Sequence, residues 1–328
     1  MAKPHIVIIS PYLANANNGN WQTARRWSRF LNAKFKTTLA LEWDKSSGDC
    51  KGIDAMIALH ARRSAASIEA FAAACPGRPL VVVLTGTDLY RDILSDATAQ
   101  RSLQLASRLL VLQAEGLQML DKKYHEKTEV IYQSAPVLKP FNVQPPKQTR
   151  YFDVTMVGHL RAEKDPATFM QAARLVKTDK VRLIHIGGVL DPDLGVQAEN
   201  TQKQYPRYQW LGNVAHAATR QRLKRSQLMV IASKMEGGAN VIIEAVTSGV
   251  PVLASDISGN RGMLGDDYEG YFPCGDSIKL ASLIDRAAAE PAFYKRLQAQ
   301  CHKRAYLFTP EQECASLLNF IDRCIKHR

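Results

Sequence analysis

Short runs of β-branched and apolar residues alternate along this chain with longer stretches in which apolar residues recur at helical spacing. This alternation is typical of βα units, which build parallel sheets. In the first half the pattern predicts strands at His5–Ser10, Thr37–Leu41, Ala55–Leu59, Leu80–Thr85, Leu109–Leu112 and Thr128–Tyr132. It predicts helices between them at Trp21–Asn32, Ala65–Ala74, Ala97–Ser107 and Ala114–Tyr124.

A second series of the same kind follows the polar, proline-containing segment Val137–Arg150. Its expected strands are Val154–Gly158, Val181–Gly187, Tyr208–Leu211, Leu228–Ala232, Pro251–Ala254 and Tyr271–Phe272. Its expected helices are Pro166–Thr178, Ala217–Arg225, Asn240–Thr247, Ser277–Glu290 and Pro291–Tyr306, and a last amphipathic helix covers Glu311–Lys326.

These two series predict an α/β protein with two doubly wound, Rossmann-like domains that face each other across a crevice. The expected boundaries are residues 1–140 for the N-terminal domain and 150–306 for the C-terminal domain. No strand follows the last helix, so the segment 307–328 is expected to cross back and pack on the N-terminal domain. Ligands should bind in the crevice, at the carboxyl ends of the strands.

The composition indicates a globular protein. Of the 328 residues 46% are hydrophobic and 23% are charged, as in ordinary globular proteins. No apolar run reaches the 18 or so residues of a membrane-spanning helix, and the first residues read as a strand and not as a signal peptide. We therefore expect a cytoplasmic protein without stable membrane insertion. The six cysteines show no metal-binding spacing, so free thiols are expected.

The net charge of +12 is concentrated in residues 1–150, where 20 Lys and Arg face 12 Asp and Glu, a surplus of 8. Such a surplus suits nucleic acid, an anionic membrane surface or an anionic small substrate. No Lys/Arg run interleaved with aromatic residues appears, so nucleic acid is the weakest of these candidates.

The most informative motif runs from Ser233 to Glu244 and is closed by Gly249 and Pro251. Two glycines after a strand let the backbone approach a ligand closely, and a helix that opens near Asn240 presents N–H groups suited to a phosphate oxygen. The carboxylate of Glu244, one turn inside, is placed to accept hydrogen bonds from a ribose diol. The alternative is a purely structural role, as a tight turn followed by a helix with a capping acid.

The Glu-x7-Glu spacing of Glu236 and Glu244, in this strand–loop–helix setting, resembles the family-4 retaining glycosyltransferases, whose two-domain architecture is called GT-B. The segments Val157–Lys164, Trp210–Val214 and Pro251–Asn260 share the resemblance. It implies that Glu236 binds hydroxyls of the transferred sugar and that Glu244 binds the ribose. The remaining implied donor-binding residues are Gly187, Val214, Gly237, Gly238, Ala239, Asn240 and Val241, with Arg161 and Lys164 on the diphosphate.

Two positions depart from that family. His159 stands where an arginine is common, so Arg161 would have to reach the diphosphate by another path, or else is a solvated loop residue. Thr85 stands where a histidine is common, before Gly86 and Asp88. This departure indicates either an altered acceptor or a position under less constraint.

The amide-rich segment Ala14–Trp27 is similar to that of the selenosugar synthases of selenoneine biosynthesis. This resemblance implies that selenophosphate is joined to the sugar of UDP-GlcNAc or UDP-glucose, with release of UDP, and that the product is handed to other enzymes of that pathway. Amides, backbone N–H groups and arginines suit a small anionic nucleophile. The expected acceptor-binding residues are Asn17, Asn18, Gly19, Asn20, Thr23, Arg26, His60, Thr85 and Asp88.

Other functions stay open at this stage. The chain is alternatively a glycosyltransferase for a lipid-linked or glycan acceptor, or a non-catalytic protein that binds nucleotide-sugars. A sugar epimerase would need an acid/base pair, which the sequence does not offer convincingly. Asp191-Pro192-Asp193 formally matches a DxD metal motif, but it is expected in a loop, and no metal or other cofactor is expected.

Overall fold

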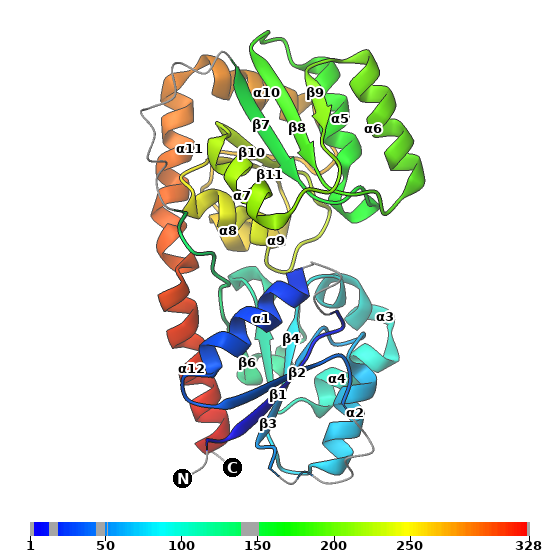
Figure 1. Cartoon of the computed structure of the whole chain (residues 1–328), viewed down its shortest axis with the longest axis vertical. Helices are drawn as coiled ribbons and strands as arrows, with labels where there is room; N and C mark the ends of the chain where they lie inside the picture. The colour runs from blue at the N-terminus through cyan, green and yellow to red at the C-terminus, as the bar shows by residue number, and fades with distance from the viewer. Residues whose placement is uncertain (1–2, 13–18, 44–49, 51, 139–150, 327–328) are drawn as a thin grey trace. The chain divides into compact units, whose positions relative to one another are not determined.

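The computed structural model describes residues 3–12, 19–43, 50, 52–138 and 151–326. Contacts divide the chain into two compact units. Unit 1 contains Met1–Ser134, Glu236–Gly238 and Pro310–Arg328, and unit 2 contains Ala135–Met235 and Ala239–Thr309. Each unit is built on a six-stranded parallel sheet with helices packed against it (Figure 1). The predicted fold class, two Rossmann-like α/β domains, is confirmed.

The sheet of unit 1 has the strand order β2-β1-β3-β4-β5-β6, and every neighbouring pair is parallel. Its strands are β1 (His5–Ile9), β2 (Lys36–Ala40), β3 (Ala55–Leu59), β4 (Leu80–Leu84), β5 (Arg108–Val111) and β6 (Thr128–Val130). Its helices are α1 (Gly19–Leu31), α2 (Ala65–Ala74), α3 (Ile93–Ser95), α4 (Ala97–Leu105) and α12 (Pro310–Lys326), with short helical turns at Asp88–Asp92, Ala114–Gly116 and Lys122–Lys127.

Alternate residues of these strands enter two separate cores, one on each face of the sheet, as the period of two in a strand requires. On one face, strand residues such as Ile57 pack with residues of α1 and α12, including Trp27 and Phe320. On the other face, neighbours such as Met56 pack with residues of α2 and α4, including Phe71. The strands are therefore apolar on both sides, which explains their nearly unbroken hydrophobic runs.

Helix α12 joins unit 1 although it follows unit 2 in the sequence. Its Glu313 is buried, with 1% of its surface exposed. The Glu313 carboxylate accepts hydrogen bonds from Arg26 Nε at 2.7 Å, from Trp27 Nε1 at 2.6 Å and from Ser134 N at 2.8 Å. Charge-assisted bonds of this kind are strong, so this one carboxylate ties α12 to α1 and to the segment after β6.

The sheet of unit 2 is also parallel throughout, with the order β12-β11-β10-β7-β8-β9. Its strands are β7 (Phe152–Val157), β8 (Val181–Ile186), β9 (Tyr208–Trp210), β10 (Leu228–Ile231), β11 (Val252–Ser255) and β12 (Tyr271–Phe272). Its helices are α5 (Pro166–Leu175), α6 (Pro192–Gln204), α7 (His216–Arg225), α8 (Asn240–Thr247), α9 (Ser258–Leu264), α10 (Ser277–Ala289) and α11 (Pro291–Arg304), with short turns at Ala162–Lys164 and Ala305–Phe308.

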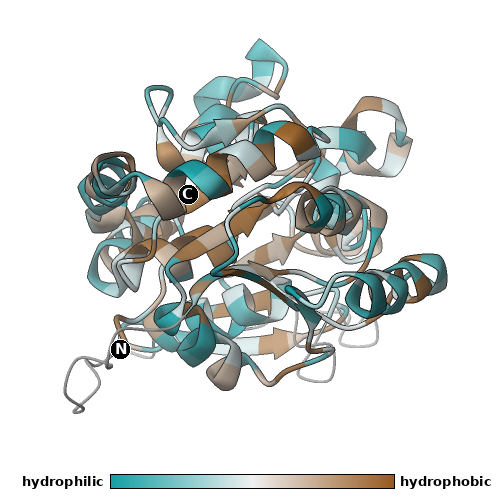
Figure 2. Ribbon diagram, turned by 90° about the horizontal axis from the view of Figure 1, so that it is seen from above, coloured by the Kyte–Doolittle hydropathy of each residue, from teal (hydrophilic) through white to brown (hydrophobic). Residues whose placement is uncertain are grey.

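Hydropathy follows this layering. In Figure 2 the strands are largely brown, whereas the helices carry teal segments along their lengths. Residues Val230 and Leu253 of unit 2 are fully buried. Apolar burial of this kind is the main term that favours the folded state.

Several expectations about local structure are wrong, and helix α9 (Ser258–Leu264) was not expected. The segment Ala114–Tyr124 is not a helix and forms short 3-10 turns. Helix α6 was not expected, although Asp191 caps it by accepting hydrogen bonds from Asp193 N and Leu194 N, and Pro192 takes its first position. Asp191-Pro192-Asp193 is therefore a helix start and not a loop.

The expectation of free thiols is wrong for Cys50 and Cys75, which form a disulfide with their Cα atoms 5.6 Å apart. Cys75 follows the last residue of α2, and Cys50 lies in the segment before β3. Because α2 runs back toward the start of β3, the two cysteines come together. Spacing in the sequence could not show this pairing, because the fold and not the separation of 25 residues sets the distance.

Candidate functional site

The strand order of unit 2 defines where a ligand should bind. The chain proceeds from β7 outward to β8 and β9, and then crosses to β10, β11 and β12 on the other side. The switch point therefore lies between β7 and β10, and ligands of open α/β sheets bind beside it at the carboxyl ends of the strands. The two loops that leave these strands are joined by a hydrogen bond from Lys234 N to Glu163 O at 2.9 Å.

Gly187 allows the carboxyl ends of β7 and β8 to approach closely. A Cβ atom on Gly187 would lie 1.9 Å from the carbonyl oxygen of Gly158, which no side chain can tolerate. Gly187 N donates to Gly212 O at 2.9 Å, and Trp210 Nε1 donates to Gly187 O at 2.9 Å. The predicted donor residue Gly187 thus fixes three loops at the strand ends through its backbone.

His159 follows Gly158 and is held in one tautomer. Gly188 N donates to His159 Nδ1 at 3.0 Å, and a backbone N–H can only donate, so Nδ1 carries no proton. The neutral ring then has its proton on Nε2. Burial lowers the pKa of His159, and the neighbouring charges of Arg161 and Lys164 lower it further. His159 is therefore a neutral hydrogen-bond donor where the resembled family commonly has a cation.

Arg161 and Lys164 bring positive charge to the same loop. The Nε atom of Arg161 is buried and has no hydrogen-bond partner among the described residues. A buried donor without a partner is costly, and a bound anion at the switch point would satisfy it. Lys164 packs along Gly158, whose substituted Cβ would lie 3.5 Å from the Lys164 side chain. The two predicted diphosphate-binding residues thus share the loop after β7.

Glu244 lies one turn inside α8 and is buried, with 8% of its surface exposed. Its Oε1 atom lies 2.7 Å from His216 Nε2 and 4.0 Å from Arg220 Nε. The Nε atom of Arg220 is also buried without a hydrogen-bond partner among the described residues. The Glu244 carboxylate of α8 therefore lies beside the His216 imidazole and the Arg220 guanidinium of α7.

Helix α8 begins without a side-chain cap, because its N-cap residue is Ala239. Asn240 and Val241 form its first two positions, whose N–H groups have no intrahelical acceptor. The helix ends before Gly249, which adopts a positive φ of 75°. The predicted strand–loop–helix geometry of this motif is present.

The other predicted donor residues are placed as follows. Glu236 is buried, and Glu236–Gly238 group with unit 1 by their contacts. Val214 lies between β9 and α7, where its carbonyl accepts a bond from Thr219 Oγ1 at 3.3 Å. Its backbone is therefore ordered at the carboxyl end of β9.

Of the predicted acceptor residues, Asn17 and Asn18 lie outside the described residues. Gly19 and Asn20 begin α1. Thr23 is buried, donates to Gly19 O at 2.8 Å and accepts from Gln133 Nε2, so its hydroxyl is already used. The guanidinium of Arg26 is paired with Glu313, so its charge is neutralised inside unit 1.

His60, Thr85 and Asp88 come together at the carboxyl ends of β3 and β4. Asp88 is buried and accepts from the backbone N–H groups of Ala61, Thr85 and Gly86 at 2.8–2.9 Å. Asp88 therefore holds the loop that contains Thr85, and its carboxylate is committed to that backbone. His60 is buried with a positive φ of 76°, a strained conformation that persists mainly at functional sites.

His60 Nε2 lies 3.0 Å from Thr87 Oγ1, and Nδ1 accepts from Arg63 N at 3.3 Å. The proton of the neutral ring is thus on Nε2, as in His159.

Several residues at these sites were not selected from the sequence. His216 and Arg220 flank Glu244, and Tyr12 contacts Arg63 at the carboxyl ends of β1 and β3. Arg220 NH2 also donates to Pro136 O at 2.6 Å. Helical spacing of His216 and Arg220 would have put both on one face of α7, but nothing in the sequence relates that face to Glu244.

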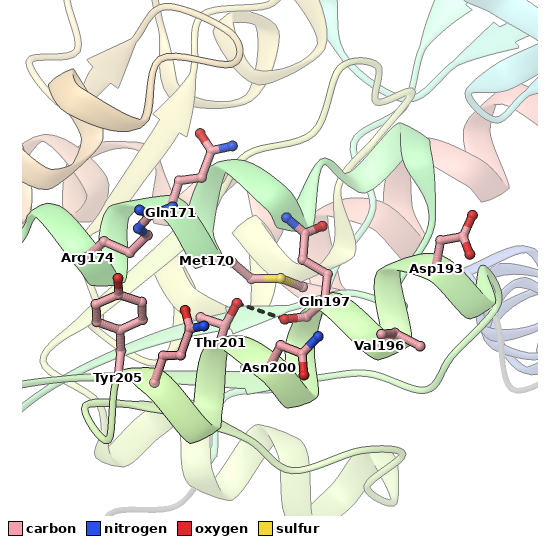
Figure 3. A pocket seen from close by; sticks show the side chains of 10 residues that line it. Met170, Gln171, Arg174, Asp193, Val196, Gln197, Asn200, Thr201 and Tyr205 are labelled. Carbon is pink, nitrogen blue, oxygen red and sulfur yellow. Dashed lines mark hydrogen bonds between the residues drawn. The ribbon is translucent and has the colours of Figure 1, made fainter.

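A groove of about 360 Å³ lies between α5 and α6 (Figure 3). Its walls carry many amide side chains, and Thr201 Oγ1 donates to Gln197 O at 2.7 Å within it. The lining residues are Met170, Gln171, Arg174, Asp193, Val196, Gln197, Asn200, Thr201, Gln204 and Tyr205. Of these, Asp193 belongs to the Asp191-Pro192-Asp193 motif selected from the sequence, and none is a predicted donor- or acceptor-binding residue.

Within the described residues, no group of three or more His, Cys, Asp or Glu side chains is arranged to hold a metal ion. No helix in that part of the chain is both long enough and apolar enough to cross a membrane.

The family described as glycosyl transferases group 1 matches residues 140–307 of this chain. The UDP-Gal:alpha-D-GlcNAc-diphosphoundecaprenol alpha-1,3-galactosyltransferase of Escherichia coli is 30% identical over 128 residues, 37% of this chain and 32% of that protein. The glycosyltransferase 1 domain-containing protein 1 of Xenopus tropicalis is 29% identical over 144 residues, 43% of this chain and 41% of that protein. The chain thus spans less than half the length of these curated relatives.

Solved structures share the fold over almost the full chain. HepE of Anabaena in complex with UDP has a TM-score of 0.78 at 17% identity, with 98% of this chain and 100% of that chain covered. Sucrose-phosphate synthase of Thermosynechococcus elongatus has a TM-score of 0.77 at 15% identity, with 99% and 100% covered. At such identities the likeness concerns the fold.

Proposed function

This chain belongs to the glycosyl transferases of group 1, and on that premise we propose that it transfers a hexose from a UDP-sugar to an anionic acceptor. The name of the Escherichia coli relative gives a UDP-sugar as its donor, and HepE was solved with UDP. The proposal extends that donor class to this chain.

The observation that carries the proposal is the buried Arg161 Nε, which has no hydrogen-bond partner in the described part of the chain and shares the loop after β7 with Lys164. An anion there would accept from Arg161, and the β-phosphate of a UDP-sugar is such an anion. Glu244 supplies the second contact, because its carboxylate suits the hydroxyls of a ribose. The backbone at Val214 would face the uracil.

The proposed role of these residues is to bind the donor and to stabilise charge on the leaving UDP. As the bond between the anomeric carbon and the UDP oxygen breaks, negative charge grows on the diphosphate, and Arg161 and Lys164 neutralise it. His159 adds a neutral N–H donor. Glu236, with the backbone of Gly237, Gly238 and Ala239, orients the hexose. Positioning then supplies much of the rate.

We propose selenophosphate as the acceptor. Its selenium would attack the anomeric carbon, forming a carbon–selenium bond while the carbon–oxygen bond to UDP breaks and UDP takes the electron pair. Water would then cleave the phosphorus–selenium bond to give phosphate and a selenol. Support comes from the amide-rich residues Asn17–Asn20 and from the surplus of positive charge in residues 1–150. Such a nucleophile needs no base to remove a proton.

A lipid-linked acceptor is the second candidate, because the Escherichia coli relative is named for a diphosphoundecaprenol acceptor. The donor chemistry would be the same, and only the acceptor would differ. The positive surplus in residues 1–150 suits this acceptor as well.

The test is UDP release from UDP-GlcNAc and from UDP-glucose, each without acceptor, with selenophosphate and with GlcNAc-diphosphoundecaprenol, with products identified by mass spectrometry. UDP formation that depends on selenophosphate, with a selenium-containing hexose, would establish the first acceptor. UDP formation only with the lipid would establish the second. Absence of UDP binding by the wild-type protein would refute the donor assignment itself.

A further inference from the structure

Unit 1 has a switch point of its own. The chain passes from β1 to β2 on one side, and then crosses to β3, β4, β5 and β6 on the other. The switch point therefore lies between β1 and β3, where a ligand of an open α/β sheet should bind. The residues that leave these two strands are Ser10–Tyr12 after β1 and His60–Arg63 after β3.

Tyr12 and Arg63 connect these two strand ends. Arg63 NH1 donates to the Tyr12 hydroxyl, and the guanidinium carbon lies 5.0 Å from the centre of the Tyr12 ring. Ser10, which is fully buried, donates through Oγ to Tyr12 O at 2.7 Å and fixes the backbone of Tyr12. The Arg63 head group is thus positioned by an aromatic ring, an arrangement that favours a planar cation.

Arg62 and Arg63 are adjacent in the sequence, but only Arg62 is paired with carboxylates among the described residues. Arg62 Nε lies 2.7 Å from Asp96 Oδ2, and its NH1 lies 3.8 Å from Asp92 Oδ1. Among the described residues, no carboxylate lies within 4.0 Å of the Arg63 guanidinium. The charge of Arg62 is therefore balanced by carboxylates, whereas that of Arg63 has no such partner in the part of the chain that the structure describes.

The loop that carries Arg63 is held rigidly. His60 adopts a positive φ of 76° and accepts from Arg63 N through Nδ1, and Asp88 accepts from Ala61 N at 2.9 Å. Strain that the surroundings impose on a buried histidine is expected where a loop must keep one conformation for binding. Arg63 is thus an ordered guanidinium at the switch point of unit 1, without a paired carboxylate among the described residues.

From this geometry we infer that Arg63, seated on Tyr12, binds the phosphate group of the acceptor, and that Arg62 does not. The inference rests on the proposed function, which supplies the need for an acceptor. A guanidinium binds phosphate through two parallel N–H···O bonds, a geometry that lysine cannot reproduce. Selenophosphate and a lipid-linked diphosphate share this chemistry.

The test compares Arg63→Ala, Arg63→Lys and Tyr12→Phe with the matched control Arg62→Ala. In acceptor kinetics, Arg63→Ala should raise the KM for the phosphate-bearing acceptor at least about 10-fold, the effect of losing a charged hydrogen bond. Arg62→Ala should change it less than about 3-fold, and KM for the UDP-sugar should stay unchanged in both. Selenophosphate and GlcNAc-diphosphoundecaprenol are assayed side by side, so the acceptor that loses affinity identifies the source of the phosphate.

A binding measurement separates this inference from the donor assignment. Calorimetry with selenophosphate and with inorganic phosphate should show weaker binding for Arg63→Ala than for Arg62→Ala, while UDP affinity is equal. If UDP fails to bind the wild-type protein, the donor assignment fails, but the phosphate comparison still decides the role of Arg63. Equal losses for Arg62→Ala and Arg63→Ala, or no loss for either, would overturn the inference.

Discussion

Replacement of Glu313 by Gln should release α12 from unit 1. The carboxylate receives five hydrogen bonds: from Arg26 Nε and NH2, from Trp27 Nε1, and from Ser134 N and Oγ, at 2.5–3.1 Å. A glutamine turns one acceptor oxygen into a donor, which would then face donors, and leaves Arg26 without a counter-charge. Breaking a buried ion pair by removal of one partner costs about 3–5 kcal/mol.

Native-state proteolysis measures this cost, because cleavage follows the population of the opened form when opening is fast. Since every 1.4 kcal/mol is tenfold, Glu313→Gln should accelerate cleavage of α12 about 100-fold to several thousand-fold. Asp322→Asn is the matched control on the same helix, where Lys34 and Asp322 form a 2.8 Å pair that is 51% and 26% exposed. An exposed pair contributes at most about 1 kcal/mol, or roughly fivefold. Similar acceleration in both variants would refute the role given to Glu313.

Three further outcomes are expected in unit 2. Burial lowers the pKa of His185 from 6.5 to about 4. As the pH falls, the unfolded chain therefore binds this proton before the folded protein does, so the stabilisation is complete only above about pH 6.5. The free energy of unfolding of the wild-type protein should fall by about 2 kcal/mol between pH 7 and pH 5. Urea unfolding at both pH values checks this, and a His185→Gln variant that keeps the whole loss would contradict it. Gly187→Ala places a Cβ 1.9 Å from Gly158 O and should reduce turnover about 100-fold by displacing the loop after β7, which contains Arg161 and Lys164. The control is Gly195→Ala, whose Cβ meets only the Val189 side chain at 3.2 Å; its turnover should stay near that of the wild type in the same assay. Glu244→Ala should raise the KM for the UDP-sugar about 10- to 150-fold, the range for a lost charged hydrogen bond. With a donor that contains deoxyribose, the KM of the variant and that of the wild type should differ much less. An equal difference for both donors would show that Glu244 does not bind the ribose.

The fold could be predicted because its strands are apolar on both faces and its helices carry one apolar stripe. Residues such as Ile57 and Met56 are both buried, on opposite sides of β3, and this produces the unbroken runs that the sequence displays. Helix α6 was missed because only Gly195 and Ala198 of its residues are buried, so almost no apolar period exists to detect. Its cap, Asp191 followed by Pro192, was the signal that should have identified it.

The strand–loop–helix geometry of the segment Ser233–Glu244 could be predicted because it is local: β10, a loop and α8 follow each other within residues 228–247. The surroundings of Glu244 could not be predicted, since His216 lies on another helix and reaches the carboxylate only through packing. The same holds for Arg26, a predicted acceptor residue whose partner Glu313 is 287 residues away. A sequence shows which groups are available, and the fold decides which of them are already used.

The position of α12 also sets the order in which the chain can finish folding. Leu317, Phe320 and Ile321 belong to the same core as the residues of β1, β3 and α1, so that core is incomplete until the last helix has left the ribosome. All strands of unit 2 precede α12 in the sequence, so they are synthesised before that helix. The unit whose strands come first in the sequence is therefore completed only after α12 is made, and until then the core around Trp27 lacks the apolar side chains of that helix.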